Sequence, residues 1–151
     1  FIGKEDERRL ILRLIAEYNP FLLDVEFNAI QKDKKLASYL RKTKCKLLIS
    51  WHDFKKTPNE SQLRSKFNKM AKFSDIVKIV TVANSVSDAS RLLSLYSIKS
   101  ENETIAFCMG EQGKFSRILC LHLGSPFTYV SLGKAIAPGQ FSLREIKSLE
   151  C

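Results

Sequence analysis

The chain contains 151 residues, of which 44% are hydrophobic and 27% are charged. This length and this balance exclude a disordered or fibrous chain and predict a single globular domain over residues 1–151. No apolar run reaches the roughly 18 residues that a membrane-spanning helix needs, and the first residues lack the pattern of a signal peptide. We therefore expect a cytoplasmic protein with no membrane partner.

The formal net charge of +9 suits anionic partners, from small carboxylates to nucleic acid. Much of this charge lies in residues 32–46, which include seven lysines and arginines. No zinc-finger, RGG or aromatic-interleaved RNA motif accompanies them, so we interpret them as a solvated helix face and expect no nucleic-acid partner. The four cysteines are widely spaced and form no CxxC pair, which predicts reduced thiols and no metal site.

The first predicted elements are a helix and a strand. Residues 5–18 begin with three acidic residues, continue with apolar residues at helical spacing and end before an Asn-Pro pair. Residues 21–27 form the first expected strand, in which Asp24 and Glu26 stand two residues apart. Alternate residues of a strand point to the same side, so the two carboxylates share one face. A polar barrel lumen, an active-site mouth and a solvated edge strand all explain this arrangement.

The alternation of helix and strand continues along the chain. A helix is expected at residues 31–42 and a strand at residues 47–50. Thr57-Pro58-Asn59-Glu60 has the pattern of a capping box with proline at the first helical position, so a helix is expected to begin there. The later expected elements are strands at 74–82, 104–109 and 127–130, and helices that begin at Ser85, near residue 118 and at Ser142.

Lys78 stands in the middle of the most apolar of these strands, residues 74–82. A run of β-branched and apolar residues is typical of a strand buried on both faces of a parallel sheet. Burial disfavours a charged ammonium group and lowers its pKa, and a neutral amine is a nucleophile that forms Schiff bases with carbonyl compounds. The alternative is an ordinary lysine on an edge strand, or one whose ammonium group extends to water.

The five expected strands are separated by helices, which is the pattern of βα units in a parallel sheet. Such units place their functional loops beyond the carboxyl ends of the strands. His52, the loop 109–117 and Gln140 all fall at such ends. The sequence therefore predicts one site there, rather than scattered polar residues.

Four motifs occur in order: Ser50-Trp51-His52-Asp53-Phe54, Asp75-Ile76-Val77-Lys78-Ile79, Met109-Gly110 with Ser116-Arg117, and Ala137-Pro138-Gly139-Gln140. In this order and spacing the sequence resembles type I 3-dehydroquinate dehydratases over nearly its whole length. The resemblance implies an α/β fold of the (β/α)8 TIM-barrel family, of which this chain would hold the last five βα units, strands 4–8. It also implies a lyase of the shikimate pathway of aromatic amino acid biosynthesis, which dehydrates the small molecule 3-dehydroquinate to 3-dehydroshikimate through an imine, without a metal or cofactor.

The resemblance assigns the two chemical roles. Lys78 corresponds to the Schiff-base lysine, whose amine condenses with the C3 ketone, so that the imine acts as an electron sink and acidifies the proton at C2. His52 corresponds to the general acid/base, which removes that proton and helps the C1 hydroxyl group leave as water. An imidazole suits both steps because its pKa lies near working pH.

Four further residues are implied to contact the substrate. Arg117 corresponds to the residue that grips the substrate carboxylate, which a guanidinium group can do in a bidentate manner. Gln140 corresponds to a hydrogen-bonding partner of a substrate hydroxyl or carboxylate on a closing loop, and Met109 and Tyr129 correspond to apolar walls. Ile136 departs from the family, which often has a small hydroxyl residue there, so one substrate hydrogen bond is lost.

The larger departure is at the start of the chain. The first three strands of the family carry a Glu-x-Arg-x-Asp motif and an arginine followed by a Glu-Gly-Gly turn, which contact the substrate and orient the histidine; neither motif is present. Five parallel strands also leave open edges and cannot close a barrel. Three explanations remain open: a fragment of a longer protein, a chain that pairs with an N-terminal segment or forms a homodimer, or a cleaved chain. We expect the isolated 151 residues to have little or no activity.

Two other functions fit parts of the sequence. One is an aldolase that also uses a barrel lysine, although Trp51-His52 and Gly139-Gln140 argue against it. The other is a non-catalytic truncated barrel that serves as an interaction module, using its basic surface.

Overall fold

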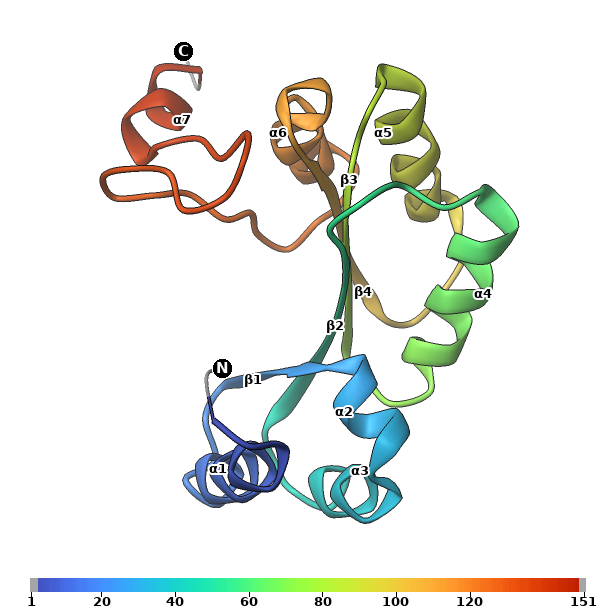
Figure 1. Cartoon of the computed structure of the whole chain (residues 1–151), viewed down its shortest axis with the longest axis vertical. Coiled ribbons are helices and arrows are strands. Elements are labelled where there is room, and N and C mark those ends of the chain that lie inside the picture. The colour runs from blue at the N-terminus through green and yellow to red at the C-terminus, as the bar shows by residue number, and fades with distance from the viewer. Residues whose placement is uncertain (1–2, 150–151) are drawn as a thin grey trace.

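A computed structural model of the chain describes residues 3–149. Its centre is a sheet of four strands that are all parallel and lie side by side in chain order (Figure 1). The strands are β1 (Leu22–Glu26), β2 (Lys46–Asp53), β3 (Ile76–Val82) and β4 (Glu103–Met109). The prediction of a parallel α/β sheet is therefore confirmed.

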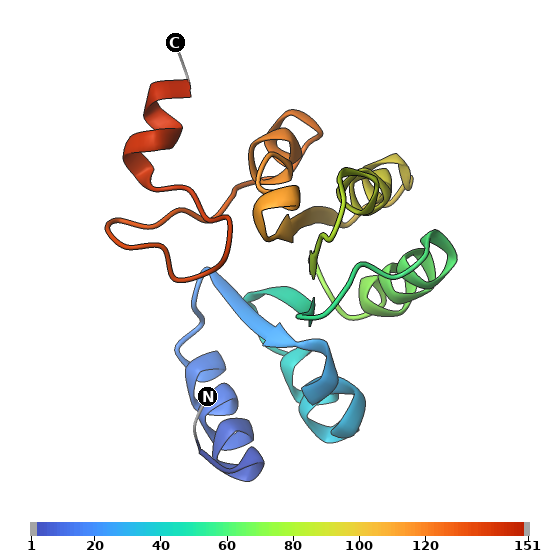
Figure 2. The same ribbon diagram turned by 45° about the horizontal axis from the view of Figure 1, so that its top comes forward.

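The helices lie in an arc around the outside of the strands (Figure 2). They are α1 (Glu5–Glu17), α2 (Phe27–Lys32), α3 (Lys34–Leu40), α4 (Glu60–Ala71), α5 (Val86–Leu93), α6 (Ser116–His122) and α7 (Leu143–Leu149), with short 3₁₀ helices η1 (Ser94–Ser97) and η2 (Glu111–Gly113). Within residues 3–149, no helix combines the length and the apolar character needed to cross a bilayer.

β3 is buried on both faces, as its apolar run predicted. It pairs with β2 on one side and β4 on the other, so Lys78 does not lie on an edge strand. Val77 and Ile79 pack into the outer core, which the helices cover. A second, smaller core contains the inner-face residues Leu48, Ile76, Val80, Ile105, Phe107 and Met109, together with Leu93 of α5 and Cys120 of α6. Because side chains alternate along a strand, Lys78 belongs to this inner face.

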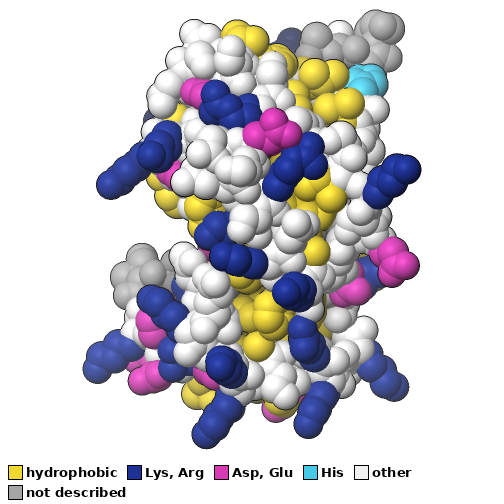
Figure 3. All heavy atoms as spheres, turned by 90° about the vertical axis from the view of Figure 1, so that its right-hand side faces the viewer, with side chains coloured by type: hydrophobic (Ala, Val, Ile, Leu, Met, Phe, Trp, Pro, Cys, Tyr) yellow, Lys and Arg dark blue, Asp and Glu magenta, His cyan; other side chains and the backbone are white. Residues whose placement is uncertain are grey.

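The basic stretch 32–46 differs from its prediction in one respect. The expected single helix is divided by Asp33, whose extended backbone ends α2 and whose side chain accepts hydrogen bonds from the backbone N–H groups of Lys35 and Leu36 at the start of α3. All seven basic side chains of the stretch are exposed. Figure 3 shows the outer face of the molecule, where many Lys and Arg side chains project into solvent.

The capping box before α4 is displaced from its predicted position. The cap is Asn59, whose side chain accepts a hydrogen bond from the backbone N–H of Gln62, and α4 begins at Glu60. Thr57, which was expected to cap the helix, is buried and lies 2.7 Å from the hydroxyl oxygen of Thr81. The predicted caps at Ser85 and Ser142 are confirmed by their hydrogen bonds to the third residue of each helix.

The predicted fifth strand, residues 127–130, is wrong. In the part of the chain that the structure describes, the sheet ends at β4, and Ser131 forms only an isolated bridge with Ser142. Phe127 and Tyr129 instead turn their rings to each other at 5.6 Å, and Tyr129 contacts Phe107 on β4 at 6.0 Å. Aromatic packing on the inner face thus replaces strand pairing, so the described sheet contains four βα units rather than five.

Candidate active site

Lys78 projects from the inner face of β3 toward the first strand of the sheet. Its Nζ lies 2.9 Å from Oδ2 of Asp24 on β1, and the residue is only 8% exposed. Nζ also lies over the ring of Tyr129, 4.3 Å from the ring centre. β1 and β3 are separated by β2, so the ion pair crosses the inner face of the intervening strand.

The pKa of Lys78 differs from the prediction made from its burial. Burial is the largest single influence and lowers the pKa, but the charge of Asp24, its hydrogen bond and the neighbouring Tyr129 together raise it above its ordinary value. Of the two alternatives that the sequence left open, the charged form is the one that this arrangement favours, because a carboxylate on β1 faces the ammonium group. Lys78 is a charged lysine in a buried position.

His52 ends the inner face of β2 and is paired with a second carboxylate from β1. Its Nδ1 lies 2.5 Å from Oε1 of Glu26, to which an Nδ1–H group donates a hydrogen bond. The imidazole ring also stacks on Phe54, with 5.7 Å between the ring centres. The sequence motifs marked no acid that orients this histidine, but Glu26 on β1 makes that contact.

Arg117, the second residue of α6, is buried almost completely, with 2% of its surface exposed. Its guanidinium carbon lies 4.5 Å from the ring centre of Phe107, and burial lowers its pKa. Among residues 3–149 no carboxylate lies within 4.0 Å of its side-chain nitrogens, and its Nε has no hydrogen-bond partner. A buried cation without a protein anion favours binding of an anionic ligand.

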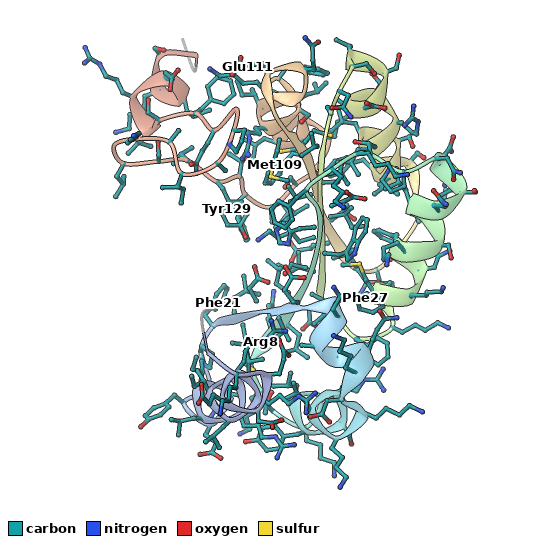
Figure 4. All side chains as sticks on the ribbon, viewed as in Figure 1. Arg8, Phe21, Phe27, Met109, Glu111 and Tyr129 are labelled. Atoms are coloured by element: carbon teal, nitrogen blue, oxygen red, sulfur yellow. The ribbon has the colours of Figure 1, made fainter. Side chains whose placement is uncertain are left out.

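A cavity of about 240 Å³ brings these groups together. Its lining includes all six residues that the sequence predicted for the site: Lys78, His52, Arg117, Gln140, Met109 and Tyr129. Figure 4 shows Met109 at the end of β4 and Tyr129 in the segment after α6, both between the sheet and the C-terminal part of the chain. Their predicted roles are not tested by this geometry, but their predicted proximity is confirmed.

The segment 136–140 contributes Ile136, Ala137 and Gln140 to the lining of the cavity. The backbone N–H of Gly110 donates to the carbonyl oxygen of Pro138 at 3.2 Å, which ties this segment to the end of β4. The side-chain oxygen of Gln140 accepts a hydrogen bond from the backbone N–H of Ile136 at 3.0 Å. Ile136 itself is 89% exposed, although it belongs to the lining of the cavity.

The sequence profile described as type I 3-dehydroquinase matches residues 1–149. The chain belongs to the type I 3-dehydroquinase family. Relatives named 3-dehydroquinate dehydratase include those of Pyrobaculum aerophilum, 42% identical over 142 residues, and Dehalococcoides mccartyi, 36% identical over 149 residues. The alignments cover 93% and 97% of this chain, but only 45% and 66% of these two relatives.

Solved structures of type I 3-dehydroquinases share the fold of this chain. The type I 3-dehydroquinate dehydratase of Clostridium difficile, described with covalently modified comenic acid, matches with a TM-score of 0.85 at 25% identity, over 99% of this chain and 61% of that chain. The 3-dehydroquinate dehydratase of Aquifex aeolicus matches with a TM-score of 0.81 at 32% identity, over 96% and 65%. The parallel sheet is thus that of the TIM-barrel fold to which these enzymes belong.

Asp24 and Glu26 are the site residues that the type I 3-dehydroquinase motifs did not mark. Their only signal in the sequence was the spacing of two residues, which placed both carboxylates on one face of the first strand. Both carboxylates face the site, where they contact Lys78 and His52. β1 is also the edge strand of the described sheet, and the side chain of Asp24 is 42% exposed. In the described part of the chain, no group of three or more His, Cys, Asp and Glu side chains is arranged to hold a metal ion.

Proposed function

We propose that this chain carries the imine-forming part of a 3-dehydroquinate dehydratase site, in the cytoplasmic shikimate pathway of aromatic amino acid biosynthesis. Its β1 to β4 would correspond to strands 4 to 7 of the eight-stranded barrel. The observation that carries the proposal is the cavity in which a buried lysine, a carboxylate-bound histidine and an unpaired buried arginine meet. The names of the relatives supply the substrate, 3-dehydroquinate, and the reaction, a dehydration; the family resemblance implies 3-dehydroshikimate as the product.

Lys78 is the proposed nucleophile. Its amine attacks the ketone carbon of 3-dehydroquinate, the carbonyl oxygen leaves as water, and a protonated imine remains on Nζ. This positive charge withdraws electrons from the neighbouring C2 and makes its proton acidic. The Clostridium difficile relative is described with a covalently modified compound, which is consistent with a nucleophilic side chain in this family.

His52 is the proposed general acid/base. With Nδ1 engaged by Glu26, Nε2 is left free to remove the C2 proton of the imine and then to protonate the departing C1 hydroxyl group. The carboxylate fixes the tautomer and the direction of the ring, and it stabilises the imidazolium that forms between the two steps. Elimination of water then gives the imine of 3-dehydroshikimate, which hydrolysis releases from Lys78.

The remaining cavity residues account for the recognition of the substrate. Arg117 would bind the carboxylate of 3-dehydroquinate, because a planar guanidinium group that lacks a protein anion can accept a carboxylate on two N–H groups. Gln140 would turn from Ile136 to a substrate hydroxyl group when the loop closes. Met109 and Tyr129 cover the apolar face of the ring and exclude water.

Borohydride trapping tests this proposal. The chain is incubated with 3-dehydroquinate and sodium borohydride, which reduces an imine to a stable secondary amine, and the protein is analysed by intact mass and peptide mapping. We expect one adduct, on Lys78, and none in Lys78→Ala. His52→Ala is the matched variant: it should keep the adduct, because it leaves the nucleophile in place. An adduct that persists in Lys78→Ala, or that forms with aldol substrates and not with 3-dehydroquinate, would contradict the proposal.

A further inference from the structure

The carboxylate of Asp24 is held at both oxygens by residues of two other strands. Oδ2 lies 2.9 Å from Nζ of Lys78 on β3, and Oδ1 accepts a 2.6 Å hydrogen bond from the hydroxyl group of Ser50 on β2. Ser50 is itself buried and stands opposite Lys78 in the pairing of β2 with β3. The rotation of Asp24 is therefore restricted, and its charge is directed at Nζ.

No other carboxylate of the described chain takes this position. Glu26, the second acid on β1, contacts His52, and the other acids in ion pairs bind arginines or lysines outside the cavity. The remaining titratable groups around Lys78 are the His52 ring from β2, Arg117 from α6 and the Tyr129 ring. Neither His52 nor Arg117 in its charged form would stabilise a positive Nζ, so Asp24 supplies the full negative charge that faces it.

Imine formation keeps the charge on Nζ constant. An ammonium group and a ketone give a protonated imine and one water molecule: the nitrogen–carbon bond forms, the carbon–oxygen bond breaks, two of the three ammonium hydrogens leave in the water, and one stays on nitrogen. Nζ therefore carries one positive charge before and after the reaction. A carboxylate at 2.9 Å can stabilise both forms, because the nitrogen atom is the same.

We propose that Asp24 is the counter-ion of Lys78 in both states, and that Ser50 positions it. This inference rests on the proposed function, since the second state exists only if Lys78 forms the imine. Asp24 has two opposite effects. It slows the first attack, because it favours the ammonium over the nucleophilic amine, and it speeds the loss of the C2 proton, because it keeps the imine protonated.

The first test measures the amine alone. Each variant is labelled with trace acetic anhydride over a range of pH, and mass spectrometry gives the pH at which Lys78 is half reactive. In Asp24→Asn, which keeps the shape of the side chain, we expect this midpoint to fall by about one pH unit or more. Glu26→Gln is the matched control, because it removes a charge from the same strand at a carboxylate that contacts His52. An equal shift in both variants, or none in Asp24→Asn, would overturn the inference.

The second test follows the imine itself, by mass, after borohydride trapping. The adducts of 3-dehydroquinate and 3-dehydroshikimate differ by one water molecule, so their ratio reports how far dehydration has gone. At neutral pH, Asp24→Asn should form total adduct about tenfold faster, because the neutral fraction of an amine rises tenfold when its pKa falls by one pH unit. The share of dehydrated adduct should fall. If the unsubstituted chain gives no adduct, the proposed function fails, while the labelling midpoints still decide whether Asp24 controls the charge of Lys78.

Discussion

Two carboxylates on one short strand determine the state of the two reactive side chains. Asp24 and Glu26 are each followed by a buried residue, Val25 and Phe27. Their spacing in the sequence did not show how close they lie to Lys78 or His52. The pairing of β1 with β2, and of β2 with β3, brings them within 2.9 Å and 2.5 Å of these groups. The strand alone left the charge of Lys78 open, and the contact with Asp24 favours the charged form. The protonation of a buried group thus depends on contacts between strands.

Arg117 should illustrate a conflict between stability and binding. Replacement by methionine removes a buried cation that has no carboxylate partner in the described chain, so we expect the free energy of unfolding to stay the same or to rise by about 1 kcal/mol. The same change removes the proposed ligand of the substrate carboxylate. The yield of borohydride adduct should therefore fall about tenfold or more at subsaturating 3-dehydroquinate, since a charged hydrogen bond contributes about 1.5–3 kcal/mol.

Urea unfolding and trapping of the same preparation check both parts of this expectation. Arg64→Met is the control, because Arg64 forms an exposed ion pair with Glu60 on α4 and lies outside the cavity. It should change neither measurement appreciably. A variant of Arg117 that unfolds more easily and still gives the full adduct would show that the guanidinium group serves packing and not binding.

At the scale of elements, the sequence predicted what depends on local pattern. The apolar run of 76–82, the four parallel strands and the caps at Ser85 and Ser142 follow from periodicity and short-range hydrogen bonds. The motif residues also met in one cavity, because parallel strands bring their carboxyl ends to the same edge. The prediction of a strand at residues 127–130 was wrong because an aromatic stretch can pack through its side chains as well as by strand pairing. The parts of the fold that lie next to this segment decide between side-chain packing and strand pairing, and a single sequence does not show which parts these are.

The turn that carries Gln140 depends on one glycine. Gly139 has φ of 70°, and a Cβ atom there would lie 2.6 Å from the carbonyl oxygen of Gly110. The Cβ atom would meet backbone atoms of Gly110, which cannot move away unless the chain itself shifts. Gly139→Ala should destabilise the attachment of residues 136–140 to β4 by about 1–3 kcal/mol and withdraw Gln140 from the cavity.

Hydrogen exchange of the Gly110 N–H group is the measurement, because this group donates to Pro138 across the attachment. We expect its exchange to become faster in Gly139→Ala, together with a lower yield of adduct. Gly133→Ala is the matched control, since a Cβ atom at Gly133 meets nothing within 4 Å and its backbone needs no left-handed conformation. Unchanged exchange in Gly139→Ala would mean that this segment is held elsewhere.

At the scale of the whole molecule, the two faces of the sheet have different tasks. The outer face packs against helices α2 to α5 through the larger apolar core, while exposed basic residues stay on the solvent side of these helices (Figure 3). The inner face combines a smaller apolar core with Asp24, Ser50, Lys78 and His52. These polar groups can be accommodated there because each of them has a hydrogen-bond partner on another strand. The fold can therefore hold its reactive groups without weakening the main core.

Several buried groups should make the whole molecule sensitive to alkaline pH. Burial raises the pKa of the thiols of Cys108 and Cys120 and of the Tyr96 hydroxyl, and Asp24 outweighs burial to raise the pKa of Lys78. Each of these groups holds its proton more tightly in the folded chain than in the unfolded chain. Stability is therefore intact below the unfolded pKa values, about 8.5 for a thiol and about 10 for tyrosine and lysine, and it falls as pH rises beyond them.

Urea unfolding between pH 7 and pH 10.5 should show this loss. Each group that has lost its proton only in the unfolded state contributes a slope of about 1.4 kcal/mol per pH unit, so the two thiols should dominate first. Cys108→Ala and Cys120→Ala are each expected to lower stability at pH 7, because both side chains are fully buried, but to flatten the decline above pH 8.5. If the variant with both cysteines replaced loses stability with the same slope, the alkaline sensitivity belongs to Lys78 and Tyr96. Asp24→Asn should then reduce the part of this loss that comes from Lys78.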